Sequence, residues 1–467
     1  MPKDHLDRIA VNVIKKAWAS LLERRTPRSE TEIAHFTDNE QDVGFLKDVD
    51  ALNTLIEPFL LVPKAFDDPP MKYDEIEAYM QHLLAQITPP PKPETAVESR
   101  EGAPAFRGFQ ATPYPYVEQP VDYVDSAAAV LRLLGNFSQL TEIRKRQMPR
   151  ALATSVAATA CSAVDFLLAA ATDDSDGARW QGILKLTDPP GRYANLFFTN
   201  VAALALHKAH SHGFIAKALG PDRSEQIRRL VANVPKWVVN QYDPALKTFW
   251  MDAAKTMNQV VGVLYALELI YLLLKDTPEP YPPCCAAALS AAVKRMTDHS
   301  HASSLQTDFF HSLPMPAGAG NMYYDDRRYI GGFLALFALA KANDPNVVTE
   351  DFIDAGVTLW GGVTKEWIDE TTGLWDHGRP LVCYSQDAIL GMVRYAQEGV
   401  VNSVTLREND LRSAIKDALA NDAVVDAVVE AIVLRADRKE ESDFADALVR
   451  KAGRQETSQP RKPRDPR

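Results

Sequence analysis

The stretch DAAKTMNQVVGVLYALELIYLLL, residues 252–274, indicates most clearly how this chain folds. From Val260 to Leu274 it is apolar on every side of a helix except at Glu268, and a helix of that kind must be buried all round. It is shorter than the ~20 residues that a membrane span needs. The sequence therefore predicts a core helix of a globular protein and no membrane span.

Similar helices recur along the chain, and a short motif precedes each of them. The motif is an aromatic residue, one further residue and a short polar side chain. Its copies are Tyr123-Val-Asp125, Tyr193-Ala-Asn195, Trp250-Met-Asp252, Tyr324-Asp-Asp326 and Tyr384-Ser-Gln386. They lie 57 to 74 residues apart, so each interval has room for two antiparallel helices with their turns.

The helices between these copies have a different character. Segments such as SAVDFLLAAA and DFIDAGVTLWGGVTKEWI are amphipathic, and convincing β-strand alternation is absent from this part of the sequence. Buried helices inside a ring of amphipathic helices form an α/α toroid. We therefore predict an all-α fold, a double ring of antiparallel helices with N-terminal and C-terminal helical extensions.

Composition shifts divide the chain into five predicted parts. Residues 1–88 form an N-terminal helical region, and residues 89–120 form a linker because their eight prolines cannot continue a helix. Residues 121–400 form the toroid domain. Residues 401–450 form a C-terminal module of amphipathic helices, which either packs on the toroid or docks a partner. Residues 451–467 form a disordered basic tail.

Charge and cysteine usage exclude several classes of protein. The formal net charge is −11, which argues against a protein that coats nucleic acid. Charges at Lys3, Asp4, Asp7 and Arg8 interrupt the apolar run that a secretory signal would need. The four cysteines show no CxxC spacing and fit reduced thiols rather than a disulfide framework. We expect a cytoplasmic protein.

Metal and cofactor sites are not predicted. The adjacent Cys284 and Cys285 seldom both face one ion, and the histidines gather in two groups that lack the spacing of a zinc site: His207, His210 and His212, and His299, His301 and His311. Phosphate-binding glycine loops are absent, and Gly331-Gly332 and Gly361-Gly362 are interpreted as points of close helix packing.

Two connections carry a resemblance to a known family. FLLAAATDDSDGARWQG and WIDETTGLWDHGRP each join an outer helix, a turn with Asp and Gly, a tryptophan and an inner helix. This resembles the repeat of the terpenoid cyclase and protein prenyltransferase toroids over about residues 120–400. The cyclases' Asp-x-Asp-Asp and the prenyltransferases' Asp-x-Cys with a later His are missing. The resemblance therefore implies the fold and no activity.

The repeated polar residues are the candidate site. In toroids the cavity opens at the N-terminal ends of the inner helices, so these residues would meet there in an acidic, aromatic lining that suits sugars or cations. The candidate ligand-binding residues are Asp125, Tyr193, Asn195, Trp250, Asp252, Tyr324, Asp325, Asp326, Trp375, Tyr384 and Gln386. The alternative is that each Asp or Asn only caps its helix.

The turn Trp375-Asp376-His377-Gly378 concentrates polar and aromatic groups most strongly. Asp376 could orient or charge the imidazole of His377, or it could only form a turn hydrogen bond. The catalytic candidates are Asp376, His377, Asp326 and Asp252. Paired carboxylates among them could act as general acid and base.

Three functions stay open at this point. Our first hypothesis is a toroid that binds a ligand or a protein without catalysis, because the catalytic motifs of the families it resembles are absent. Its partner would be an unknown protein or a small polar ligand. The alternative is a hydrolase or lyase that acts on a carbohydrate or other polyhydroxyl substrate in the acidic, aromatic cavity. A terpenoid cyclase-like enzyme is third, since it would need an apolar cavity.

Overall fold

A computed structural model describes much of the chain in atomic detail. The chain divides into two compact units, Met1–Val401 and Asn402–Arg467, and every described residue lies in the first. The predicted C-terminal helical module and basic tail therefore lie outside the described residues. Those residues are 8–23, 25–26, 35–36, 45–66, 68–87, 122–184, 194–211, 213–255, 261–275, 277, 280–297, 329–366 and 382–397.

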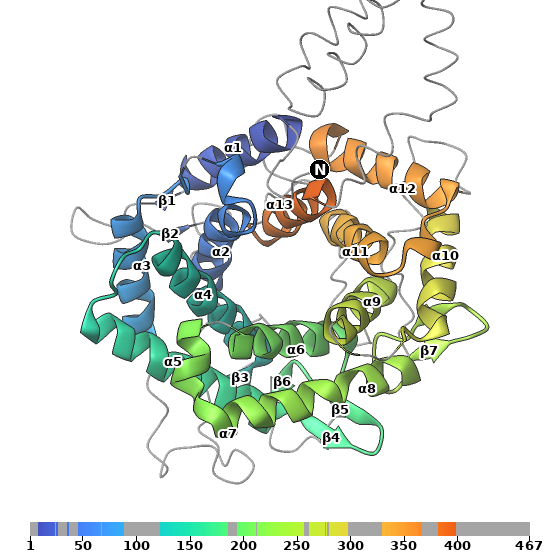
Figure 1. Ribbon diagram of the computed structural model, residues 1–467, viewed down its shortest axis with the longest axis horizontal. Helices are drawn as coiled ribbons and strands as arrows, with labels where there is room; N and C mark the ends of the chain where they lie inside the picture. The colour runs from blue at the N-terminus through green and yellow to red at the C-terminus, as the bar shows by residue number, and fades with distance from the viewer. Residues whose placement is uncertain are drawn as a thin grey trace, which may run out of the picture. The chain divides into compact units, whose positions relative to one another are not determined.

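Helices of the described residues form a closed inner ring (Figure 1). Each packs against the next in chain order, and the last packs against the first. The ring confirms the predicted α/α toroid. Its members are α2 (Phe45–Leu61), α4 (Val124–Ile143), α6 (Leu196–Ser211), α9 (Val261–Leu274), α11 (Ile330–Asn343) and α13 (Val382–Gln397).

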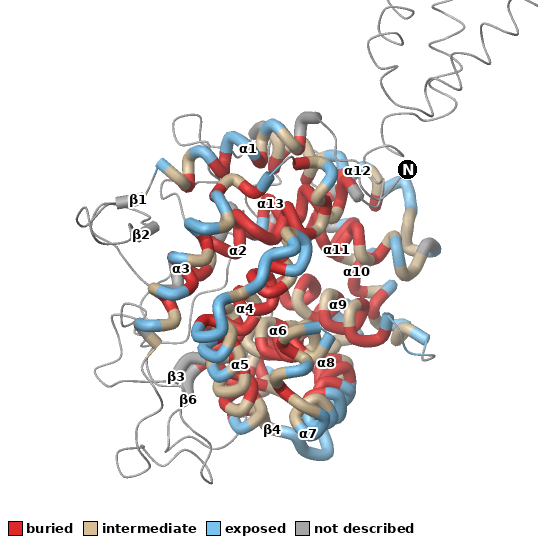
Figure 2. The backbone as a smooth tube through the Cα atoms, turned by 60° about the vertical axis from the view of Figure 1, so that its left-hand side comes forward, coloured by how far each residue is buried: buried red, intermediate tan, exposed pale blue. Residues whose placement is uncertain are grey.

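Amphipathic helices surround this ring. Figure 2 shows exposed residues along their outward faces and buried residues within the inner ring. A kink in α7 coincides with Gly220, whose φ is 74°, and Pro221. The outer helices are α1 (Arg8–Glu23), α3 (Tyr73–Gln86), α5 (Arg150–Ala170), α7 (Gly213–Ala232), α8 (Val234–Asn240), α10 (Pro283–Thr297) and α12 (Glu350–Gly361). Short 3₁₀ segments cover Pro63–Ala65 and Pro345–Val347, and a π-helical turn covers Gly362–Glu366.

The strands of the described residues form antiparallel pairs in the connections and at one end of α4. The pair β4 and β5 starts with Thr172 opposite Arg179, and β3 and β6 place Asp122 opposite Leu184. Each sheet in the described residues has two strands, so the sheets hold the connections in place and do not form the core. The pairs are β1 (Arg25–Thr26) with β2 (His35–Phe36), β3 (Asp122–Tyr123) with β6 (Ile183–Leu184), β4 (Thr172–Asp174) with β5 (Gly177–Arg179), and β7 (Tyr242–Asp243) with β8 (Thr248–Phe249).

The ring begins earlier in the chain than we predicted. We placed the toroid at residues 121–400, but α2 lies between α13 and α4 and completes the inner ring. Its side chains from Ala51 to Leu60 are all buried. The helix therefore belongs to the ring and not to a separate N-terminal region.

Two inner helices do not begin where their motif predicts. The helix α9 begins at Val261, nine residues after Asp252, which instead pairs with Asn195 in an isolated bridge. The helix α13 begins at Val382, so Gln386 lies one turn inside it. Only Asp125 and Asn195, among the described copies, stand at a helix start. The spacing found the helices correctly but misplaced two of their ends.

The connection TDDSDGARWQG is a tight hairpin between α5 and the next inner helix. Gly177 has φ of 110°, and a Cβ there would lie 2.6 Å from the carbonyl oxygen of Asn233, so glycine is required. Trp180 is fully buried and donates its Nε1–H to the carbonyl oxygen of Leu167 at 2.7 Å. Its part in the resemblance is therefore packing.

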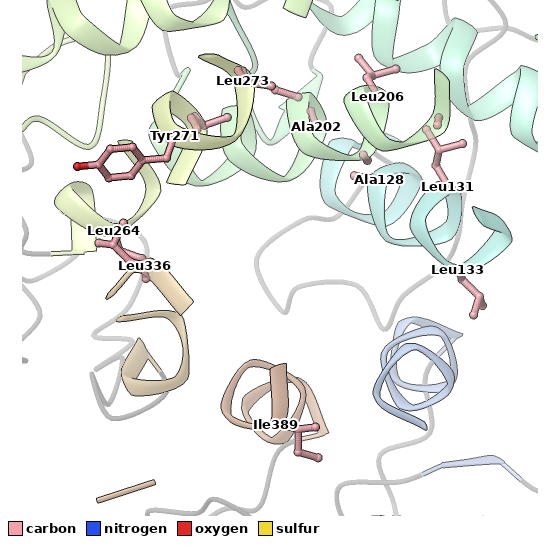
Figure 3. Close-up of a cluster of buried hydrophobic side chains, with 14 of the residues drawn as sticks. Ala128, Leu131, Leu133, Ala202, Leu206, Leu264, Tyr271, Leu273, Leu336 and Ile389 are labelled. Atoms are coloured by element: carbon pink, nitrogen blue, oxygen red, sulfur yellow. The ribbon is translucent and has the colours of Figure 1, made fainter. Parts of the chain in front are cut away.

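Apolar contacts fill the spaces between neighbouring inner helices (Figure 3). Leu264 of α9 lies beside Leu336 of α11, and both are buried. Among the described helices, α5 is long and apolar enough by length and composition to cross a membrane. In this structure α5 packs against α4 and α7 in the outer ring.

Glycines set the closest approach in the ring, between α11 and α13. A Cβ on Gly331 would lie 2.2 Å from the carbonyl oxygen of Asp387, and one on Gly391 would lie 2.0 Å from that of Gly331. Close packing at Gly331 is thus confirmed. The same expectation for Gly361 was wrong, because nothing lies within 4 Å of its Cβ position.

This contact predicts that Gly391→Ala destabilises the protein. The added methyl group meets backbone, which cannot rotate away, so α11 and α13 must separate at a cost of about 1–3 kcal/mol. Urea unfolding followed by circular dichroism measures the change. The matched control Gly361→Ala has open space around it and should raise the stability by up to about 1 kcal/mol. Equal effects of the two variants would contradict the packing.

Candidate functional site

Four of the described inner helices, α4, α6, α9 and α13, have a partly exposed stripe, and most other side chains along them are buried. The stripes follow helical spacing, as expected for one face of a helix. On α4, for example, the stripe begins at Asp125 and passes Ala129 to reach Arg132. The others are Phe197, Val201, Leu204 and Lys208 on α6, Tyr265, Glu268 and Leu272 on α9, and Asp387 and Arg394 on α13. We call these stripes, with Asp50 of α2, the lumen face.

The lumen face has two ends because the inner helices run parallel. The residue numbers of contacting pairs increase in the same direction on both helices. Asn53 of α2 contacts Ala129 of α4, and Glu57, one turn later, contacts Arg132. The end near the helix N-termini is called the mouth below, and the other end is called the floor. Asp125 therefore lies at the mouth, and Arg132 lies two turns, ~10 Å, further toward the floor.

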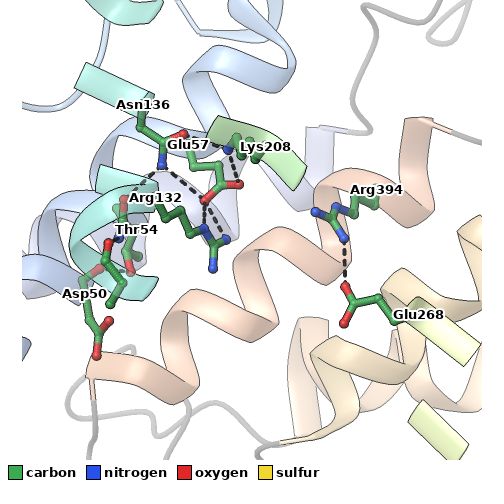
Figure 4. A network of polar contacts seen from close by, with 10 residues as sticks. Asp50, Thr54, Glu57, Arg132, Asn136, Lys208, Glu268 and Arg394 are labelled. Atoms are coloured by element: carbon green, nitrogen blue, oxygen red, sulfur yellow. Dashed lines mark hydrogen bonds and ion pairs between the residues drawn. The ribbon is translucent and has the colours of Figure 1, made fainter. Parts of the chain in front are cut away.

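A buried carboxylate organises the floor (Figure 4). Glu57 of α2 accepts hydrogen bonds from Nε of Arg132 at 2.8 Å and from Nζ of Lys208 at 3.3 Å. Lys208 also donates to Oδ1 of Asn136 at 2.8 Å, and Asn136 donates to Glu57 at 3.4 Å. Three inner helices, α2, α4 and α6, thus meet at one carboxylate.

The cations around Glu57 determine its protonation. Burial would raise the pKa of Glu57, but the charges of Arg132, Lys208 and Arg394 outweigh it and lower the pKa to about 2. The pKa of Lys208 is lowered by burial, and Arg132 and Arg394 lower it further, against the opposing charge of Glu57. Glu57 is therefore ionised throughout the neutral range.

A second ion pair crosses the other half of the ring. Nη1 of Arg394 on α13 lies 3.3 Å from Oε1 of Glu268 on α9, although α11 stands between those helices. Oε2 of Glu268 accepts a hydrogen bond from Asn200 of α6 at 3.0 Å. Glu268 thus links α6, α9 and α13.

Carboxylates and aromatic rings occupy the mouth. Burial raises the pKa of Asp125 to about 6, although the backbone N–H of Ser126 donates to it at 2.9 Å. Asp50 and Asp387 lie close enough to Arg132 that their charges raise its pKa, together with that of Glu57 and against burial. Asp50 stands seven residues before Glu57 and Asp387 seven residues before Arg394, so these two carboxylates, like Asp125, lie toward the mouth.

The aromatic row passes across three inner-ring positions. The ring of Phe197 lies edge-on to that of Tyr265, with centroids 5.5 Å apart. Tyr265 in turn lies edge-on to Tyr329, directly before α11, at 6.1 Å. Phe197 and Tyr265 belong to the lumen face. This gives the site apolar surface beside its carboxylates.

The predicted site residues have different positions. Asp125 lies at the mouth, whereas Asn195 caps α6 by accepting a hydrogen bond from the N–H of Phe198 at 2.9 Å. Asp252 and Gln386 are buried, and Trp250 is half-buried in the connection after β8. Tyr384 lies in α13, and its side chain is outside the described residues. So are Tyr193, Tyr324, Asp325, Asp326, Trp375, Asp376 and His377, for which the site prediction stays a prediction.

The charged residues of the floor were not among the predicted site residues. Their signal was present, because otherwise apolar inner helices each carry an isolated charge: Arg132 in SAAAVLRLLGN, Glu268 in the helix quoted first, and Arg394 in DAILGMVRYA. A charge in a helix that is buried all round must have a partner or face a polar cavity. The motif spacing directed attention to the helix ends instead.

Metal binding finds no support in the described part of the chain. No group of three or more His, Cys, Asp or Glu side chains there could hold an ion. The rings of His207 and His210 lie edge-on to each other with centroids 5.3 Å apart. Cys161, Cys284 and Cys285 are free thiols.

Comparisons with known proteins find similar solved structures at low sequence identity. No protein-family model and no curated protein matches the sequence. An inactive variant of an α-1,6-mannanase from Salegentibacter, solved with an α-1,6-mannose tetrasaccharide, gives a TM-score of 0.49 at 12% identity over 83% of this chain and 99% of that one. A family 76 glycoside hydrolase from a bovine Bacteroides thetaiotaomicron strain gives 0.46 at 12% over 83% and 77%. A sugar epimerase from a ruminal bacterium gives 0.48 at 11% over 85% and 100%.

These comparisons correct our first hypothesis. We expected a toroid without catalysis, because the motifs of terpenoid cyclases and prenyltransferases are absent. The similar structures are two glycoside hydrolases and a sugar epimerase. Absence of the cyclase and prenyltransferase motifs argues against those two activities and does not by itself indicate a protein without activity. The carbohydrate alternative replaces the first hypothesis.

The network at Glu57 predicts a large effect of Glu57→Gln. Glutamine keeps the shape but leaves Arg132 and Lys208 without their counter-charge, which should cost about 3–5 kcal/mol of unfolding free energy at neutral pH. Chemical denaturation measures this loss. Glu225→Gln is the control, since it breaks an exposed pair with Arg228 and should change the stability little.

The same residue predicts a pH dependence. The pKa of Glu57 is about 2 in the folded protein against an ordinary value of 4.5, so its contribution is complete above pH 4.5 and is lost as the pH falls toward 2. That contribution is on the order of 3 kcal/mol. Glu57→Gln should flatten the stability profile in this window. An unchanged slope would contradict the role of Glu57.

Proposed function

We propose that this protein is an enzyme that acts on a carbohydrate bound against the lumen face. One observation supports the proposal: Asp125, Asp50 and Asp387 and the rings of Phe197 and Tyr265 are all partly or fully exposed residues of the inner helices, on the lumen face defined above. Aromatic rings give a sugar an apolar surface to pack on, and carboxylates accept hydrogen bonds from its hydroxyl groups.

Asp125 is suited to be the general acid. Its pKa of about 6 keeps a substantial fraction of the side chain protonated at slightly acidic pH, whereas an ordinary aspartate has released its proton there. In glycoside hydrolysis a carboxylic acid of this kind protonates the leaving oxygen. The cause of the raised pKa is burial, and no carboxylate partner is needed to explain it.

Asp387 and Asp50 are candidates for the second carboxylate. Both act on the guanidinium of Arg132, and Asp387 is exposed although α13 is otherwise largely buried. A carboxylate beside a cation is suited to act as base or nucleophile, while a carboxylate in an apolar environment acts as acid. Burial raises the pKa of Asp125, whereas Asp50 and Asp387 lie near a cation. These two environments support an acid and a base in one site, which is what a hydrolase or a lyase needs.

The resemblance to terpenoid cyclases and prenyltransferases is limited to the toroid fold. A cyclase would need an apolar cavity around one acid, but this lumen face also carries Arg132, Lys208, Glu268 and Arg394. The charged lining therefore favours a polar substrate over an isoprenoid. A cytoplasmic location likewise stays a proposal, supported by cysteines that show no CxxC spacing and fit reduced thiols.

Turnover of an oligosaccharide panel tests the proposal. The panel should include α-1,6-linked mannose oligomers, because one of the similar structures was solved with such a ligand. We expect at least one oligosaccharide to be cleaved or rearranged, as measured by mass spectrometry of the products. If no oligosaccharide of the panel is bound or turned over, the proposal is wrong.

The role of Asp125 gives the proposal a sharper test. Asp125→Asn removes the proton donor and should lower kcat by about 10²-fold or more, the contribution of a positioned acid or base. Because the acid must be protonated, wild-type kcat should fall as the pH rises through about 6. Asp351→Asn, in the first turn of the outer helix α12, is the matched control and should leave both properties unchanged. A profile that rises through pH 6 would assign Asp125 a different role.

A further inference from the structure

The floor of the lumen concentrates positive charge, of which the proposed acid and base chemistry uses only that of Arg132. Arg132, Lys208 and Arg394 come from three different helices, and each lies within the electrostatic influence of Glu57. Arg132 and Arg394 also both act on Lys208. The three cations therefore share one region, although like charges repel one another.

Exposure distinguishes the three cations from Glu57, whereas Glu268, the partner of Arg394, is 19% exposed. The side chains of Arg132, Lys208 and Arg394 are 31%, 32% and 27% exposed, whereas Glu57 is 4% exposed. Both oxygens of Glu57 are already occupied by Arg132, Lys208 and Asn136. A molecule in the lumen thus meets the cations, while Glu57 lies behind them and fixes the positions of two.

Arg394 is the cation with most remaining capacity to bind. The hydrogen bonds to Glu57 come from Arg132, Asn136 and Lys208, and none of them comes from Arg394. Among the described residues its hydrogen-bonding partner is Glu268, through Nη1 at 3.3 Å. A guanidinium has five N–H donors, so most of those on Arg394 are available to a ligand.

We propose that Arg132, Lys208 and Arg394 form a subsite for an anionic group, and that the carbohydrate substrate carries that group. The sugar part rests on the proposed function, while the anion subsite stands on the cations alone. Carboxylate, sulfate and phosphate groups share the required chemistry, because each presents several negatively charged oxygens to Arg and Lys. The substrate then lies with its anionic group at the floor and its reacting bond nearer Asp125 at the mouth.

Titration calorimetry on the full chain tests the subsite, with matched neutral, uronate-containing, sulfated and phosphorylated oligosaccharides and with inorganic sulfate. We expect the anionic ligands to bind more tightly than their neutral counterparts, and their binding to weaken as NaCl is raised. The best anionic sugar distinguishes a carboxylate from a sulfate or phosphate ester.

Variants connect this preference with the floor. Arg394→Gln should lower the affinity for anionic ligands about tenfold to a hundredfold, which is the loss expected for a charge-assisted hydrogen bond. It should leave the affinity for neutral ligands nearly unchanged. Arg394→Lys keeps the charge and should retain part of the affinity. Arg228→Gln removes the same charge from the exposed face of α7 and is the matched control. Melting temperatures check that each variant is folded.

The outcomes separate the two proposals. Sulfate binding that depends on Arg394, without binding of any sugar, supports the anion subsite and contradicts the carbohydrate function. Turnover of neutral sugars that depends on Asp125, with no preference for anionic ligands and no effect of Arg394→Gln, overturns the anion subsite and supports the carbohydrate function.

Discussion

The inner ring depends on one constraint: each of its helices must be buried on every side except a narrow stripe. Outer helices cover the back of each inner helix, and neighbouring inner helices cover its flanks. Glycines at the α11 and α13 contact make this possible where the two backbones nearly touch. Polar groups in the middle of the described inner helices, such as Arg132 and Glu268, therefore meet solvent along these stripes.

This constraint explains how much of the fold the sequence could predict. A helix that is apolar all round and too short to span a membrane must be buried in a core, so residues 260–274 and their counterparts, with the amphipathic helices between them, were enough to predict the double ring. The same reasoning missed α2, because Asp48, Asp50, Asn53 and Glu57 make it look like a helix with a solvent face. Those polar groups in fact lie buried or partly buried within the ring.

The site was less predictable because its partners are distant in sequence. Glu57 and Lys208 are 151 residues apart, and no local pattern connects them. Asn195 fitted the polar motif equally well as a ligand and as a cap, and the structure shows it as a cap. Asp125 fitted both roles too, yet its stripe continues to Arg132, which gives it a place on the lumen face.

The contact between α2 and α13 differs in kind from the other contacts of the inner ring. Every other neighbouring pair is joined by the intervening chain, whereas these two helices come from opposite ends of the ring's sequence. Within the inner ring this contact joins the helices that are furthest apart in sequence, and pairings of that kind form slowly. During synthesis the ring stays open until residue 397 has left the ribosome, and until then α2 lacks one of its two neighbours. A chaperone that covers this apolar surface would have its natural target in the unfinished chain.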